Sequence, residues 1–108
     1  MVPEAFELRV THSAEGATVE VVGELDVATA PQLRLCLDEV LRDMGERTRL
    51  VIDLGAVNFV DSTGLTIFIG AHKRSESQQV SLSLLRPQPN VRKVLAITGL
   101  DTVLDISV

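Results

Sequence analysis

The chain has 108 residues, of which 45% are hydrophobic and 23% are charged, and its formal net charge at pH 7 is −5. This composition is that of a globular protein, and the length fits one domain spanning residues 1–108 rather than a disordered or fibrous chain. The acidic balance and the three aromatic residues argue against nucleic-acid binding, which needs basic surfaces and stacking platforms.

Secretion and membrane insertion are not indicated by the sequence. The chain does not open with the basic and apolar regions of a signal peptide, and no run of about 18 apolar residues occurs. The single cysteine, Cys36, has no internal disulfide partner, and its apolar helical position predicts a buried small side chain rather than a reactive thiol. We therefore expect a soluble, cytoplasmic protein that does not bind membranes.

The first two predicted strands form a hairpin. Residues 6–10 alternate between apolar and polar side chains, and residues 19–22 are rich in β-branched side chains before Gly23. The polar segment 12–16 between them is predicted to be a turn. We interpret His12 in this turn as a surface residue, because no second ligand or catalytic side chain stands at a suitable spacing.

A first helix is predicted after this hairpin. Thr29 and Gln32 have the spacing of a capping box, and Pro31 is tolerated in a first turn, where its N–H would be unpaired anyway. Gly45 suits the position that ends the helix. Apolar side chains at steps of three and four form one stripe, so the helix is expected to pack on a sheet. The stripe consists of Leu33, Cys36, Leu37, Val40, Leu41 and Met44.

A buried strand and a second helix are predicted in the middle of the chain. Residues 50–54 are almost continuously apolar, as in a strand covered on both faces, and residues 55–60 are expected to form a tight passage. Either Asp61 or Ser62 can cap the helix that follows. We expect this helix to end near His72, which we interpret as a boundary residue rather than a catalytic base. Its apolar side consists of Leu65, Ile67, Phe68 and Ile69.

The start of this second helix is the candidate site. A helix N-terminus has unpaired N–H groups and partial positive charge, so it favours an anionic group beside Ser62 and Asp61. The bare pattern also fits an ordinary helix cap. Gly64 and Gly70 each weaken the helix by about 1 kcal/mol relative to alanine. A glycine at position 64 fits a place where another group approaches the backbone closely.

The last third of the chain completes the pattern. Residues 72–79 are expected to form a polar helix end and loop, and residues 80–85 form a strand by their alternation. Asn90 can cap a short helix that ends at residues 98–99, and residues 103–106 suit a final edge strand. The order of these elements predicts an α/β fold with one mixed sheet of four to five strands. An N-terminal β-hairpin is followed by parallel β-α units, and the helices pack against the sheet.

Three blocks of the sequence resemble the STAS domain family, and within it the bacterial anti-sigma factor antagonists. The blocks are Gly23–Asp26 with Ala28–Pro31, then Val60–Leu65, and finally Val91–Leu95 with Thr98–Leu100. They keep the order and spacing of the family over roughly residues 5–106. Members commonly continue into a C-terminal helix, whereas this chain stops at Val108, which leaves open any partner contact through such a helix.

The resemblance implies a binding protein controlled by phosphorylation, without a cofactor, metal or catalytic residue. In such proteins the serine equivalent to Ser62 is phosphorylated by a partner that is both an anti-sigma factor and a serine kinase. The unphosphorylated form binds that kinase and frees the sigma factor, and a PP2C-type phosphatase restores it. Thr63 is the alternative acceptor. The partner-binding residues implied are Asp26, Asp61, Ser62, Thr63, Gly64 and Leu65, in a monomer or weak dimer.

Simple electrostatics supports such a switch. A phosphoryl group on Ser62 adds about −1.5 to −2 charges at neutral pH. We expect the N–H groups of residues 63–65 to hold it locally, so that the fold is kept. Since Asp61 and Asp26 already make the surroundings acidic, a docked partner would meet new bulk and repulsion.

Other functions fit the sequence less well. A hydrolase with a nucleophile elbow needs glycine two residues before the serine, where this chain has Val60. No P-loop pattern of Gly-Lys-Ser/Thr after a Gly-rich run is present. The main alternative is a STAS subunit of a stress-sensing assembly or of a lipid-transport system.

Overall fold

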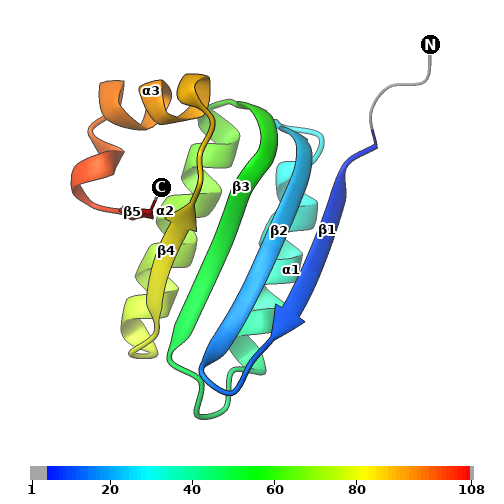
Figure 1. Ribbon diagram of the computed structural model, residues 1–108, viewed down its shortest axis with the longest axis vertical. Coiled ribbons are helices and arrows are strands. Elements are labelled where there is room, and N and C mark those ends of the chain that lie inside the picture. Colours follow the sequence, from blue (N-terminus) through cyan, green and yellow to red (C-terminus); the bar gives the residue numbers. More distant parts are fainter. Residues whose placement is uncertain (1–4, 108) are drawn as a thin grey trace.

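One mixed sheet of five strands, in the order β1-β2-β3-β4-β5, forms the centre of this computed structural model, which describes residues 5–107 (Figure 1). The strands are β1 (Glu7–His12), β2 (Gly16–Leu25), β3 (Arg49–Val60), β4 (Ser81–Leu85) and β5 (Asp105–Ser107). The helices are α1 (Ala30–Arg42), α2 (Ser62–Ser77) and α3 (Pro89–Ile97), followed by the short 3-10 helix η1 (Leu100–Thr102). β1 and β2 are antiparallel and all other neighbours are parallel, which confirms the predicted α/β architecture.

Helices α1 and α2 lie side by side on one face of the sheet, α1 behind β2 and α2 behind β3 and β4 in Figure 1. The side chains of β2 and β3 that point to this face are buried, as strand alternation requires. Phe68 of α2 is the largest fully buried side chain between the layers. The other central core residues include Val19, Val21, Leu33, Leu37, Leu50, Ile52 and Leu54. This packing fixes the direction in which α2 leaves the sheet.

Strand β3 is longer than predicted, because it runs through residues 55–60, for which we expected a tight passage. β2 continues to pair with it as far as Leu25 beside Val60, with register shifts that absorb the irregular alternation. β4 pairs with β3 only as far as Asp53. Beyond this residue, side chains that follow β4 donate hydrogen bonds to backbone carbonyls of β3. Gln88 donates to the carbonyl of Gly55 at 3.0 Å.

Asn90 also hydrogen-bonds to a backbone carbonyl of β3, further along the strand. The prediction that Asn90 caps α3 is wrong. Its amide donates to the carbonyl of Asn58 at 2.7 Å, whereas Gln88 occupies the N-cap position of α3 and makes no side-chain cap. The helix can begin without one because Pro89 stands at its first position, where a missing N–H costs nothing. The edge strand predicted at residues 103–106 is present as β5, but it covers Asp105–Ser107, and residues 103 and 104 lie outside it.

Helix α2 also extends beyond the predicted end, to Ser77. Residues 72–77 form the last turns of this helix rather than a loop, and all of them except the buried Ser75 are exposed or half-buried. His72 is therefore inside the helix, where its Nε2 lies 3.4 Å from a carboxylate oxygen of Glu76 one turn on. The prediction that His72 marks the helix end is wrong.

The boundaries of α1 differ from the prediction as well. The capping box is not formed, because the hydroxyl of Thr29 is bonded within the preceding loop instead of to the helix. The helix ends at Arg42, and Gly45 follows in the left-handed region with φ 59°. Cys36 is half-buried rather than buried. Burial raises the pKa of its thiol and the carboxylate of Glu39 adds to this, so the reactive thiolate is scarce at neutral pH.

Candidate functional site

The carboxyl ends of the neighbouring parallel strands β2 and β3 meet at one edge of the sheet, the upper edge in Figure 1. Leu25 and Val60 are register partners there, and the N–H of Asp61 donates to the carbonyl of Leu25 at 3.1 Å. Because Asp26 follows Leu25 directly, this bond joins the Asp26 loop to the start of α2. The two motifs, which lie far apart in the sequence, therefore become neighbours.

Asp61 is the residue that caps α2. Its Oδ1 accepts hydrogen bonds from the N–H groups of Thr63 at 2.8 Å and Gly64 at 3.2 Å. The N–H of Leu65 donates to the carbonyl of Asp61 at 3.1 Å. The three N–H groups that we expected to hold a phosphoryl group are thus already bonded. A negative side chain already occupies the positive end of this helix.

Ser62 is the first residue of α2 and its side chain is exposed. Within residues 5–107 no group hydrogen-bonds to its hydroxyl, although its carbonyl accepts from the hydroxyl of Thr66 at 3.0 Å. Thr63 is half-buried, while Gly64 and Leu65 are buried. Among the predicted site residues, Ser62 therefore presents the most accessible hydroxyl.

Asp26 orders the loop between β2 and α1. Its Oδ1 accepts from the N–H groups of Ala28 at 2.9 Å and Thr29 at 3.1 Å. The Thr29 hydroxyl accepts from the N–H of Asp26 at 3.0 Å and donates to the carbonyl of Glu24 at 2.7 Å. This reciprocal set explains why Thr29 does not cap α1. It also holds the half-buried Asp26 at the sheet edge from which α2 begins.

Gly64 allows the first turn of α2 to press against the ends of both strands. A Cβ atom at this position would lie 2.9 Å from Cγ and Cδ2 of Leu25 and 2.9 Å from Cγ1 of Val60. The close approach predicted for Gly64 is therefore present, and the approaching groups belong to the core. Any larger residue would push α2, and Ser62 with it, away from the strand ends.

Two apolar side chains close in sequence to Asp26 and Asp61 are exposed, and the sequence patterns did not predict their exposure. Val27, in the loop after Asp26, is 71% exposed, and Phe59, two residues before Asp61, is 46% exposed. The only sequence signal was the position of Phe59, one of three aromatic residues, directly before the Val60–Leu65 block.

The histidines do not assist Ser62. His12 pairs with Ala17, eight residues before Leu25 on β2, which places it about 26 Å away along the sheet. His72 lies further along α2 and faces Glu76. In the part of the chain described here, no three His, Cys, Asp or Glu side chains are arranged to bind a metal ion. Likewise, none of the helices within residues 5–107 has the length and apolar character needed to span a bilayer.

Known proteins resemble this chain in sequence. A model of the STAS domain family matches residues 5–107. The anti-sigma-B factor antagonist of Bacillus subtilis (strain 168) is 39% identical over 90 residues, which cover 82% of this chain and 79% of that protein. Proteins with this name are regulators rather than enzymes.

Solved structures show the same fold. An anti-sigma factor antagonist from Mycobacterium paratuberculosis is 29% identical and superposes with a TM-score of 0.86 over 98% of this chain and 88% of that chain. The anti-sigma factor antagonist SpoIIAA in its unphosphorylated form is 27% identical, with a TM-score of 0.77 over 96% of this chain and 89% of that one. The phosphorylated form of the same Bacillus protein is 26% identical, with a TM-score of 0.71 over 96% of this chain and 92% of that one.

Proposed function

Because this chain belongs to the STAS domain family, we propose that it is an anti-sigma factor antagonist whose binding is switched at Ser62. In the unphosphorylated state it binds an anti-sigma factor that is also a serine kinase, and the sigma factor is released. The kinase phosphorylates Ser62 and binding is lost. A PP2C-type phosphatase removes the phosphoryl group and restores the binding form.

The observation that carries this proposal is the exposed hydroxyl of Ser62, free of intramolecular hydrogen bonds among residues 5–107, at the first position of a capped helix. A kinase needs an acceptor hydroxyl that it can reach without unfolding the substrate. Thr63 is less suitable because it is half-buried and its backbone N–H is bonded to Asp61. Ser62 is therefore the acceptor that we assign.

The cap by Asp61 sets how the phosphoryl group acts. Since the N–H groups of Thr63 and Gly64 are held by the carboxylate of Asp61, the new group projects outward. There it adds about −1.5 to −2 charges beside the carboxylates of Asp61 and Asp26. A partner surface that complements the unphosphorylated edge would meet like-charge repulsion and additional bulk. The hydrogen bonds that fix α2 stay in place, so binding is lost while the fold is kept.

Two further features support the proposal. SpoIIAA, which resembles this chain over 96% of its length in both forms, has been solved with and without phosphorylation. The same overall fold can therefore accommodate a phosphoryl group. The exposed side chains of Val27 and Phe59 add apolar surface in the segments that flank Asp26 and Asp61 in sequence.

Phosphorylation is tested by incubating the protein with ATP and each candidate anti-sigma factor kinase from the same genome, followed by intact-mass spectrometry. The Ser62→Ala and Thr63→Ala variants are the matched controls. We expect one added phosphoryl group on the unmodified protein and on Thr63→Ala, and none on Ser62→Ala. A phosphoryl group that persists in Ser62→Ala and disappears in Thr63→Ala would contradict the assignment.

A further inference from the structure

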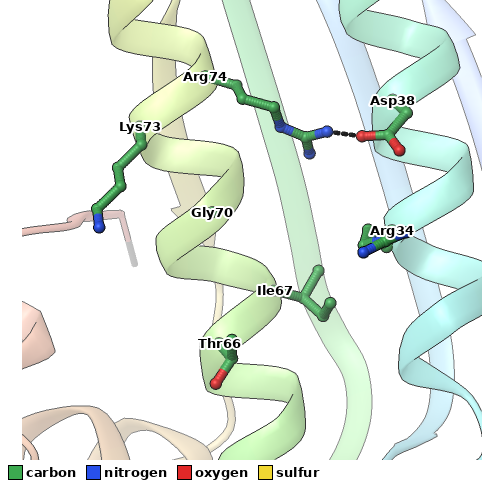
Figure 2. A pocket seen from close by; sticks show the side chains of 7 residues that line it. All are labelled: Arg34, Asp38, Thr66, Ile67, Gly70, Lys73 and Arg74. Carbon is green, nitrogen blue, oxygen red and sulfur yellow. Dashed lines mark ion pairs between the residues drawn. The ribbon is translucent and has the colours of Figure 1, made fainter.

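A groove runs between α1 and α2 on the surface that faces away from the sheet (Figure 2). Its volume is about 600 Å³. It is lined from α1 by Arg34 and Asp38 and from α2 mainly by Thr66, Ile67, Gly70 and Lys73. The side chain of Arg74 reaches across from α2 to form an ion pair with Asp38 (Figure 2). This pair bridges the two helices on one side of Gly70.

The interhelical groove leads toward Ser62. A second hollow of about 430 Å³ shares Arg34 and Ile67 with it and extends to Pro31 and Thr63. Thr63 follows Ser62 directly. Leu35, which also lines this second hollow, is 60% exposed. A segment lying in the groove would therefore reach the first turn of α2 without leaving the surface.

Gly70 lines the groove from α2, and packing within the chain does not account for this glycine. A Cβ atom built at Gly70 meets no group within 4 Å, whereas one at Gly64 would clash with Leu25 and Val60. A glycine inside a helix costs about 1 kcal/mol relative to alanine. Along residues 5–107 no element uses the space that Gly70 leaves, so we attribute it to a group from another molecule.

The charges of the groove define the kind of partner. Arg34 on α1 and Lys73 on α2, whose side chain extends to the side of α2 away from α1 (Figure 2), are exposed and form no ion pair with any group within residues 5–107, although the chain as a whole has a net charge of −5. Ile67 and Leu35 add apolar surface. An acidic segment with apolar side chains on one face complements both properties, and such complementarity promotes association and orientation.

From these features we infer that the interhelical groove binds an acidic, amphipathic segment of the same anti-sigma factor that docks at Ser62. The inference rests on the proposed function, since it adds a second contact to that complex. Each contact contributes part of the affinity. Phosphorylation at Ser62 removes the first contact, and the groove alone is too weak to hold the partner.

Two variants test the groove without touching Ser62. Gly70→Leu fills it from the floor, and the double variant Arg34→Glu/Lys73→Glu reverses its charge. The matched control is Arg92→Glu/Lys93→Glu, which makes the same change of charge with two exposed residues of α3. Affinity is measured by calorimetry against the anti-sigma factor that phosphorylates Ser62, and thermal unfolding of each variant verifies the fold.

We expect Gly70→Leu and Arg34→Glu/Lys73→Glu each to weaken binding at least about tenfold. The α3 control should bind like the original protein, and all variants should stay folded. If the original protein binds, Ser62→Asp does not, and both groove variants bind like the original, then the groove proposal is wrong while the proposed function stands. If the original protein does not bind the kinase at all, both proposals fail.

Discussion

Helix α2 contains two glycines that stand in opposite surroundings. Gly64 belongs to the first turn, where Leu25 and Val60 leave no room for a Cβ atom. Gly70 lies two turns later over open space, with no group within 4 Å of a built Cβ. The sequence pattern treats them alike, as two poor helix formers. Their difference shows that the core leaves no room for a side chain at Gly64, whereas Gly70 stands on the face of α2 that points away from the core.

This contrast has a consequence for the switch. A close fit to the strand ends, together with the Asp61 cap, gives Ser62 a fixed position at the sheet edge. A fixed residue can change the charge of a surface without moving the helix that presents it. At Gly70 the core sets no such limit, because a Cβ atom there would meet open space. Mutations at the two glycines should therefore have opposite effects on stability.

The largest change in stability is expected for Gly64→Ala. The added methyl group would overlap Leu25 and Val60, and overpacking of this kind costs about 1–3 kcal/mol. The gain of about 1 kcal/mol in helix propensity offsets part of this loss, which leaves a net loss of up to about 2 kcal/mol. Urea unfolding of the variant measures the free energy directly, and an increase in stability would contradict the close packing of the first turn.

A smaller loss is expected for Asp61→Ala, which removes the cap from the same turn. The N–H groups of Thr63 and Gly64 then lose their acceptor, at a cost of about 1 kcal/mol. Asp61→Asn is the control, because its amide oxygen can still accept these bonds. The thermal unfolding midpoint of Asp61→Asn should be close to that of the original protein, and the midpoint of Asp61→Ala should be well below both. Equal midpoints for alanine and asparagine would argue against the cap.

Gly70→Ala should have the smallest effect and the opposite sign. Since its methyl group meets nothing in the chain, alanine is expected to stabilise the protein by about 0.5–1 kcal/mol through helix propensity and a less flexible unfolded state. Urea unfolding beside Gly64→Ala makes the comparison direct. A loss of stability at both positions would mean that the two turns of α2 do not differ as described.

The sequence predicted the architecture because each element has a clear period. The stripe of α1 and the apolar runs of β2 and β3 are of the kind that local patterns reveal. The ends of elements were harder to predict. Residues 55–60 form strand because β2 remains beside them as far as Leu25, and Asn90 bonds to Asn58 instead of capping its own helix. Both outcomes depend on a neighbour far away in sequence.

Only part of the candidate site could be predicted from the sequence. Asp61 and Ser62 stand next to each other, so their placement at a helix start needed only local reasoning. The link to Asp26 needed the parallel pairing of β2 and β3, and the family resemblance indicated it before the fold did. The exposure of Phe59 and the space above Gly70 could not be predicted, because each depends on which neighbours are absent in three dimensions.

The measurement that tests the central claim most directly compares two forms of the protein, unphosphorylated and phosphorylated at Ser62, in binding to the same anti-sigma factor kinase. Thermal unfolding of both forms is recorded in parallel. We expect phosphorylation to weaken binding at least about 100-fold, or about 3 kcal/mol, while the unfolding midpoint changes little. Equal affinity of the two forms, or loss of the folded state on phosphorylation, would contradict a switch that acts through charge at a fixed helix terminus.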